Sequence, residues 1–394
     1  MCRRGGRRGL MRWRRCGGSE ARYHSLVIRR LYVHNFRCLE NFELLLREPS
    51  ALLIGKNGSG KTTVSLALEL LQKIARGTNH VRELIKPSDF TRQHTDVPVR
   101  FEIEIEIKSD IYEYVVAFEL PEGSKELRVL DEKLVVNGKP VYTRQLAEVH
   151  LAGMGRQPEG GFRIDWHLVA LTVVQEQTER DPLYIFKQRL ARVLILRPVP
   201  SLITGDSEGE TAWPNDKVTD LGAWLSDLLG YAPGAYVAME KYLRQVMPDL
   251  LDIKNERVGR DAKSIRVQFS RDQGILSLPF SVLSDGEKCY LICATAIAAN
   301  EGYGPQICFW DEPDNYLAMD EVGDFILALR KAFEAGGQFI ATSHNPEAVR
   351  RFSDENTFFL SRKSHLEPTI VRRLEDLNIK GDLIGALLRG DVEP

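Results

Sequence analysis

A glycine-rich segment, LLIGKNGSGKTT at residues 52–63, constrains the fold of this chain more than any other stretch. It matches the pattern G-x-x-x-x-G-K-[ST], with Gly55, Gly60, Lys61 and Thr62 at the fixed positions. An apolar run precedes the segment, and apolar residues recur at helical spacing after it. A strand, a glycine loop and a helix in this order place backbone N–H groups and the positive end of a helix around a phosphate. The segment therefore predicts a site for a nucleoside triphosphate.

The side chains of this loop have separate expected roles. Lys61 can reach the β- and γ-phosphates, and the Thr62 hydroxyl can ligate Mg²⁺. The loop residues expected around the phosphates are Gly55, Asn57, Gly58, Ser59, Gly60 and Thr63. A chance match to the pattern is the alternative, and the flanking strand and helix argue against it.

Composition places the chain among ordinary soluble globular proteins. Its 394 residues are 43% hydrophobic and 27% charged, which suits a large α/β domain with one sizeable insertion, or two domains. No apolar run reaches the roughly 18 residues that cross a bilayer, and the N-terminus lacks the apolar core of a secretory signal. We therefore expect a cytoplasmic protein without membrane contact. The six cysteines have no metal-site spacing, and buried free thiols are favoured over a redox pair.

Charge is distributed unevenly along the chain. Residues 1–15 hold seven arginines and no acid, although the whole chain has 53 basic and 55 acidic residues. The body is therefore acidic and gives no support for a nucleic-acid surface. Residues 1–24 have almost nothing to bury and are expected to be a disordered tail. A solvated extension, with a later start such as Met11, and an arm that grips phosphates are the two interpretations.

Several stretches have the period of a β-strand. Residues 26–36 and 40–46 predict two strands that lead into the loop strand, and residues 99–107 alternate apolar and mostly acidic side chains. Two further strand-like runs follow, with a hairpin turn at Asn137-Gly138. We expect an antiparallel sheet of several strands here. From about residue 143 to 255 the pattern is mostly helical, and strands return around a turn at 272–274.

Two carboxylates close an apolar strand in the last third of the chain. Residues 306–312 read QICFWDE, so Asp311 and Glu312 lie at the end of a buried strand. Such a pair is the expected partner of a phosphate-binding loop. Asp311 would hold Mg²⁺, and Glu312 would polarise the attacking water. A strand that simply ends in a polar turn at Pro313 is the alternative, which the loop at Lys61 disfavours.

Two further segments fit the same site. Ser284 and Glu287 form an S-x-x-E capping box at the start of a predicted helix. Ser284 and Gly286 could also bind a phosphate there, and the two roles are compatible because they use the same helix N-terminus. His344 ends the strand that follows a predicted helix at 319–334, where a contact with the γ-phosphate is favoured over a core role.

These segments in this order resemble the ABC-type ATPase family, specifically its RecF/SMC branch of chromosome-maintenance and repair ATPases. The segments that carry the resemblance are NFRCLENFELLL, the loop itself, LSDGEK, FWDEPDNYL and TSHNP. They cover residues 26–75 and 275–350, and the middle of the chain matches only in layout. Within that branch the chain is similar to the compact ATPases of bacterial overcoming-lysogenization-defect (OLD-type) and phage-defence systems.

The resemblance implies a role for each matching residue. These roles are Walker A for Lys61 and Thr62, Walker B for Asp311, catalytic glutamate for Glu312, signature motif for Ser284 and Gly286, switch histidine for His344, and a basic contact near the nucleotide for Arg37. The chain also departs from the family pattern, because Asp285 replaces the usual signature glycine and Ala318 replaces a D-loop aspartate. The Q-loop glutamine could be Gln93, Gln145 or Gln175.

The expected fold is therefore an α/β P-loop NTPase, an ABC-ATPase head with an antiparallel β subdomain and a helical insertion. Its parts would be the disordered tail at 1–24, an N-terminal ATPase lobe at 25–142, a helical insertion at 143–260, and a C-terminal ATPase lobe at 261–394.

The same resemblance implies an ATP hydrolase whose two chains sandwich two ATP molecules with Mg²⁺. Such a homodimer switch would act on DNA or RNA, or on an effector protein, with phage defence as the favoured context. A slow ATP-gated sensor or scaffold that controls a partner effector is the alternative. Transporter energisation is disfavoured by the long insertion and by the lack of a membrane segment.

Overall fold

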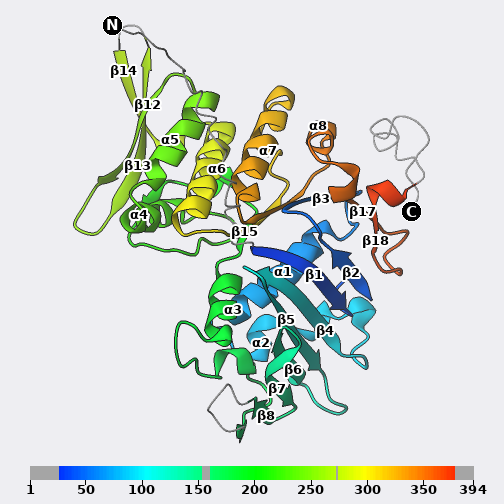
Figure 1. The fold of residues 1–394 in the computed structure, drawn as a ribbon. Helices are drawn as coiled ribbons and strands as arrows, with labels where there is room; N and C mark the ends of the chain where they lie inside the picture. The colour runs from blue at the N-terminus through cyan, green and yellow to red at the C-terminus, as the bar shows by residue number, and fades with distance from the viewer. Residues whose placement is uncertain (1–25, 153–159, 272–273, 378–394) are drawn as a thin grey trace, which may run out of the picture.

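The computed structural model describes residues 26–152, 160–271 and 274–377 (Figure 1). The arginine-rich tail predicted at 1–24 and the turn predicted around residues 272–273 lie outside the described residues. Within the described residues, no helix is both long and apolar enough to cross a membrane. The four cysteines in these ranges, Cys38, Cys289, Cys293 and Cys308, are free and buried, as the sequence predicts.

An antiparallel sheet of eight strands forms one side of the molecule. Its order is β2-β1-β4-β5-β6-β7-β8-β9. The strands are β1 Leu26–His34, β2 Phe42–Leu45, β4 Val99–Ile107, β5 Asp110–Glu119, β6 Arg128–Val136, β7 Lys139–Gln145, β8 Glu148–Leu151 and β9 Gly160–Arg163. In β4 the apolar residues are buried and the alternate residues between them are half-buried, as the period of two predicts. Asn137 and Gly138, both with positive φ, make the predicted hairpin turn between β6 and β7.

A second, mainly parallel sheet carries the glycine loop. Its order is β10-β15-β16-β3-β17-β18, and only β18 runs antiparallel to its neighbour. The strands are β3 Ser50–Ile54, β10 Leu194–Leu196, β15 Ile307–Asp311, β16 Gln338–Thr342, β17 Thr357–Ser361 and β18 Ile370–Arg373. Both faces of a parallel sheet are covered, which explains why β3, β10 and β16 are unbroken buried runs.

Alternate residues of the central strands point into two different hydrophobic cores. In β15, Ile307 and Phe309 join the core shared with the antiparallel sheet, whereas Cys308 and Trp310 join the opposite core. In β3, Leu53 and Leu52 divide in the same way. The parallel sheet is therefore the middle layer of the molecule.

The helices cover this middle layer from both sides (Figure 1). On the side of the antiparallel sheet lie α1 Lys61–Ala75, α2 Val81–Leu84 and α3 Pro182–Ala191. On the other side lie α4 Leu221–Tyr231, α5 Ala235–Val246, α6 Asp285–Gly302, α7 Met319–Glu334 and α8 Pro346–Arg350. The bounds of α7 are those that the sequence predicts. Short 3₁₀ turns connect the elements at Pro87–Asp89, Thr91–Gln93, Ala170–Thr172, Pro200–Leu202, Phe280–Val282, Asp354–Asn356 and Leu374–Asp376.

The prediction of a helical insertion at 143–260 is wrong for much of that stretch. The antiparallel sheet continues through β8 and β9, and β10 belongs to the parallel sheet. A third sheet also begins there, with β11 Asp206–Ser207, β12 Leu250–Arg257, β13 Lys263–Arg271 and β14 Gly274–Pro279. It lies with α4 and α5 at the end of the molecule opposite β5–β8 (Figure 1). Among the described residues of this stretch, α3, α4 and α5 are the α-helices that bear out the helical pattern. Strands as short as β8, β9 and β10 leave little periodicity to read.

Candidate nucleotide-binding and hydrolysis site

The predicted site residues lie at the carboxyl ends of three neighbouring strands. In the parallel sheet, β16 pairs with β15 on one side and with β3 on the other. The glycine loop follows β3, Asp311 and Glu312 follow or end β15, and His344 follows β16. Because these strands are neighbours, chain segments separated by hundreds of residues meet at one edge of the sheet. Ligands of open α/β sheets bind outside this edge.

Glycine is required at several positions of the loop. A Cβ atom at Gly55 would lie 2.1 Å from the carbonyl oxygen of Leu360, and one at Gly60 would lie 2.7 Å from the Thr369 hydroxyl. Gly58 has open space around it but a φ of 80°, which favours glycine. The loop backbone is therefore packed against β17 and the segment before β18, which fixes its curvature.

Lys61 lies inside this loop. Its side chain is buried, and its Nζ atom donates to the carbonyl oxygen of Gly55 at 2.8 Å. The same Nζ atom is 2.8 Å from Nε2 of His344. Burial lowers the pKa of Lys61, against the opposing effect of the carboxylates of Glu312 and Asp311. A phosphate would supply the counter-charge that this half-desolvated ammonium group needs.

The residues that would hold Mg²⁺ contact each other. The Thr62 hydroxyl donates to Oδ2 of Asp311 at 3.0 Å, and the Thr342 hydroxyl donates to Oδ1 of the same carboxylate at 2.5 Å. Among the described residues, no group of three or more His, Cys, Asp or Glu could hold a metal ion. One carboxylate and one hydroxyl fit Mg²⁺, which keeps several waters and takes phosphate oxygens, rather than a metal held by protein alone.

Glu312 is held in an unusual conformation beside Lys61. Its φ is 52°, and its backbone N–H donates to the Thr342 hydroxyl at 2.9 Å. Its two carboxylate oxygens face different partners, with Oε1 3.4 Å from Nε2 of His344 and Oε2 accepting from Asn315 at 2.7 Å. A positive φ at a residue other than glycine is strained and is often found at functional sites.

His344 connects Lys61 with Glu312. Burial lowers the pKa of its imidazole, and the ammonium group of Lys61 lowers it further, whereas Glu312 and Asp311 oppose the shift. A neutral ring at neutral pH can donate one hydrogen bond and accept another. This imidazole therefore has the protonation state needed to donate to a phosphate while accepting from a neighbour.

A pocket of about 350 Å³ opens over this cluster. It is lined by Arg37, Cys38, Asn57, Gly58, Gly60, Lys61, Thr62, Thr63, Glu312 and Arg362. The predicted residue Arg37 lies in this pocket, where its guanidinium is 3.1 Å from the carboxylate of Asp89. The Ser59 hydroxyl is buried without a hydrogen-bond partner, as expected of a loop whose ligand completes its contacts.

Sequence reasoning missed Cys38 and Arg362 as pocket residues. Arg362 follows β17, which pairs with β3, so it reaches the loop only through the sheet order. Cys38 directly follows the predicted Arg37, whereas nothing in the local sequence marks Arg362. Among the described residues that line the pocket, none is a glutamine, so the predicted Q-loop candidates Gln93, Gln145 and Gln175 lie elsewhere.

Ser284 and Gly286 do not line this pocket. Ser284 is exposed and caps α6: its hydroxyl accepts from the backbone N–H of Glu287 at 3.3 Å, and its own N–H donates to the Glu287 carboxylate at 2.8 Å. A Cβ atom at Gly286 would lie 3.1 Å from the carbonyl oxygen of Tyr316, just before α7. The capping box that the sequence predicts is therefore formed, and any phosphate that Ser284 binds would not be the one held beside Lys61 of the same chain.

Comparisons with known proteins agree with this architecture. A family model described as an AAA ATPase domain matches residues 27–144. No curated protein matches the chain.

Solved structures with a similar fold include heads of SMC proteins. A head with an extended coiled coil, bound to the C-terminal domain of ScpA derived from Pyrococcus furiosus, has a TM-score of 0.51 at 10% identity, covering 89% of this chain and 97% of that one. An SMC head bound to the C-terminal winged-helix domain of ScpA has a TM-score of 0.49 at 13% identity, covering 88% and 98%. The SMC head domain from Thermotoga maritima has a TM-score of 0.44 at 14% identity, with the same coverage.

These findings define the class of the fold. It is a mixed α/β P-loop ATPase fold of the SMC-head type, with an antiparallel sheet beside the parallel one. The match to an AAA ATPase domain covers the N-terminal part of this fold.

Proposed function

We propose that this protein is an ATP hydrolase that uses Mg²⁺ and works as an ATP-driven homodimer. One observation carries the proposal: the Thr342 hydroxyl holds both the Asp311 carboxylate and the backbone of Glu312. This hydroxyl therefore fixes the expected metal ligand relative to the expected catalytic glutamate. A buried threonine with both hydrogen bonds satisfied is a rigid support for the Asp311 carboxylate and for the backbone that carries Glu312.

Each residue of the cluster has a role in phosphoryl transfer to water. Thr62 and Asp311 would hold Mg²⁺, which would neutralise the negative charge that develops on the phosphates. Lys61 would turn from the Gly55 carbonyl to the β- and γ-phosphates. Glu312 would orient the attacking water, and the neutral His344 would donate to the γ-phosphate.

The position of Ser284 supports pairing of two chains. It is exposed at the N-terminus of α6 and outside the pocket of its own Lys61. The surface beside it carries three exposed apolar side chains, Val282 at 60%, Tyr316 at 40% and Met319 at 64%. Apolar side chains around a helix N-terminus suit contact with a second chain. Ser284 would then bind the γ-phosphate of the ATP held by that second chain.

The alternative is a slow ATP-gated sensor or scaffold that controls an effector protein. The observation that favours it is the replacement of two residues at the proposed dimer face: Asp285 in the first turn of α6 and Ala318 at the start of α7. A carboxylate at Asp285 would face a phosphate unfavourably. For either function we propose a cytoplasmic protein that acts on DNA, RNA or an effector in phage defence, a context that rests on the sequence resemblance alone.

Turnover of ATP with Mg²⁺ tests the proposed activity. Lys61→Ala should abolish binding or hydrolysis without unfolding the protein, because this ammonium group faces the ligand rather than the core. Lys241→Ala, on the exposed face of α5, is the matched control and should keep wild-type turnover. Unchanged hydrolysis in Lys61→Ala would rule out this site. A wild-type rate of hydrolysis that rises on adding DNA would favour the ATP-driven homodimer over the sensor or scaffold.

A further inference from the structure

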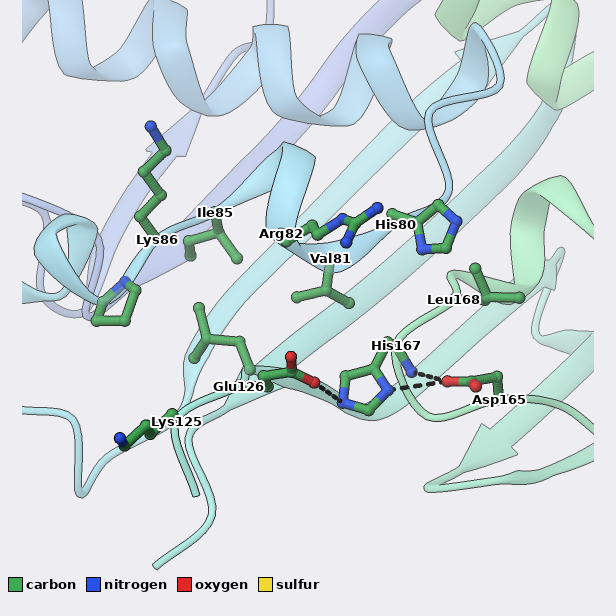
Figure 2. A pocket seen from close by; sticks show the side chains of 12 residues that line it. His80, Val81, Arg82, Ile85, Lys86, Lys125, Glu126, Asp165, His167 and Leu168 are labelled. Atoms are coloured by element: carbon green, nitrogen blue, oxygen red, sulfur yellow. Dashed lines mark hydrogen bonds and ion pairs between the residues drawn. The ribbon is translucent and has the colours of Figure 1, made fainter. Parts of the chain in front are cut away.

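A second pocket, of about 360 Å³, lies in the part of the molecule built on the antiparallel sheet. Its walls come from two parts of the chain that face each other (Figure 2). Residues 80–87, which include α2, form one wall, and residues 125–127 with residues 165–168 form the other. No residue lines both this pocket and the one at the glycine loop. Its volume lies within the range of about 300–1,000 Å³ that is usual for small-molecule sites.

The second wall is anchored by a buried ion pair. Glu132 and Arg144 have no exposed side-chain surface and approach to 3.6 Å. Glu132 accepts from the backbone N–H groups of Ala170 and Leu171, each at 2.7 Å. Arg144 donates to the carbonyl oxygens of Asp165, at 3.1 Å, and of Leu168. The segment that carries this wall is therefore fixed to the sheet.

Backbone hydrogen bonds then tie the two walls together. The N–H of Val81 donates to the carbonyl oxygen of His167 at 2.9 Å, and the N–H of Val169 donates to that of Asn79 at 2.9 Å. The pocket consequently exists without a ligand, which reduces the entropy cost of binding one.

The lining combines an apolar floor with unpaired cations. Val81, Ile85 and Leu127 are buried and give the floor its apolar character. The two carboxylates of the lining both face the ring of His167, Asp165 at 2.9 Å and Glu126 at 3.4 Å (Figure 2).

The three cations of the lining are left without such a partner. Arg82, Lys86 and Lys125 are exposed and make no ion pair among the described residues. They come from both walls of the pocket. A ligand with an apolar body and a negatively charged head would cover the floor and supply the missing counter-charge.

We propose that this pocket binds a small organic anion, with its apolar body on the Val81, Ile85 and Leu127 floor and its acidic group near Lys86 and Lys125. The site does not depend on ATP hydrolysis. Its first wall begins five residues after the end of α1, the helix that carries Lys61.

The dye 8-anilinonaphthalene-1-sulfonate is a suitable probe, because it is an apolar aromatic anion whose fluorescence rises on leaving water. Titrations use the full chain with excess ATP and Mg²⁺ in every sample, so that the glycine-loop pocket is not available to the dye. The double variant Lys86→Glu/Lys125→Glu reverses two of the three cations. Exposed ion pairs contribute modestly, so two reversals should raise the Kd about tenfold. The matched control is Lys241→Glu/Lys331→Glu, which reverses two exposed lysines on α5 and α7.

We expect one tight site for the dye. The Kd of the dye should rise in Lys86→Glu/Lys125→Glu and should stay at the wild-type value in Lys241→Glu/Lys331→Glu. We also expect displacement by phenyl phosphate or benzoate but not by the uncharged benzyl alcohol. Equal Kd values in the two double variants would place the dye elsewhere and overturn the proposal. Displacement by benzyl alcohol as strong as by the anions would show an apolar cavity without anion preference, which equally contradicts it.

Discussion

The hydroxyl of Thr342 donates to Oδ1 of Asp311 at 2.5 Å, across the boundary between β16 and β15. The hydroxyl oxygen of Thr342 also accepts from the backbone N–H of Glu312 at 2.9 Å. Thr342 has no exposed surface, so neither bond can be replaced by bulk water. Thr342 has no proposed contact with nucleotide, metal or attacking water, yet it fixes the Asp311 carboxylate relative to the backbone of Glu312.

Replacement of Thr342 should reduce turnover more than affinity for ATP. Thr342→Val keeps the shape of the side chain and removes both hydrogen bonds, at a cost of about 1–3 kcal/mol in unfolding free energy for the polar groups left unpaired. We expect kcat to fall about tenfold or more with little change in KM, because displacement of Glu312 affects the transition state. Thr342→Ser should restore most of kcat. If Thr342→Val loses stability but keeps its kcat, the residue is structural only.

Removal of the Glu312 charge should trap the proposed dimer. Glu312→Gln keeps the size of the side chain and the contact with Asn315, so ATP should still bind, while hydrolysis slows by about 10²–10⁴-fold. Light scattering with ATP and Mg²⁺ should then report twice the chain mass of 44.7 kDa.

Ser284→Arg, added to Glu312→Gln, should prevent that dimer by crowding the phosphate site at α6. Glu122→Gln, in an exposed turn, serves as the control for the charge change and should turn over and dissociate like the wild type. A Glu312→Gln protein that stays monomeric with ATP would instead favour the sensor or scaffold, since Asp285 and Ala318 would then mark a face that no longer pairs.

The nucleotide-free protein should lose stability as the pH falls, partly through His344. Its folded-state pKa lies below the ordinary value of about 6.5 because burial and Lys61 disfavour the charged ring, against the effects of Glu312 and Asp311. The unfolded chain therefore binds more protons in this range, so the contribution is complete above about pH 6.5 and is lost as the pH falls through the folded pKa. Urea unfolding at about pH 5 and pH 7 should show a smaller pH dependence in His344→Asn than in the wild type. Identical pH dependence in the two proteins would show that another group is responsible.

Glu132 should be among the most sensitive positions for stability. Its carboxylate accepts from the hydroxyls of Tyr142, at 2.7 Å, and Tyr114, at 3.0 Å, in addition to two backbone N–H groups. Glu132→Ala would leave the buried Arg144 without its counter-charge and should lower the unfolding free energy by about 3–5 kcal/mol. Glu148→Ala, at an exposed position on β8, should change it by no more than about 0.5 kcal/mol. Similar losses in the two variants would mean that the Glu132–Arg144 pair is not the anchor described above.

Local sequence determined the elements whose signals are complete within a few residues. The glycine loop, the capping box at Ser284, the hairpin at Asn137-Gly138 and helix α7 all appear where the sequence predicts them, because turn chemistry and helical periodicity act over short distances. The acidic pair and His344 could be chosen from the sequence because each closes an apolar strand.

Tertiary structure alone decided which of these strand ends are neighbours. The order β15-β16-β3 brings Asp311, Thr342 and the glycine loop together, and the pairing of β17 with β3 adds Arg362. Nothing local encodes a pairing between strands that are hundreds of residues apart, since it is selected by the burial of both sheet faces. The same reason explains the error between 143 and 260. There, β8, β9 and β10 are only three or four residues long, and they become strands because neighbouring strands accept their hydrogen bonds, not because their own pattern requires it.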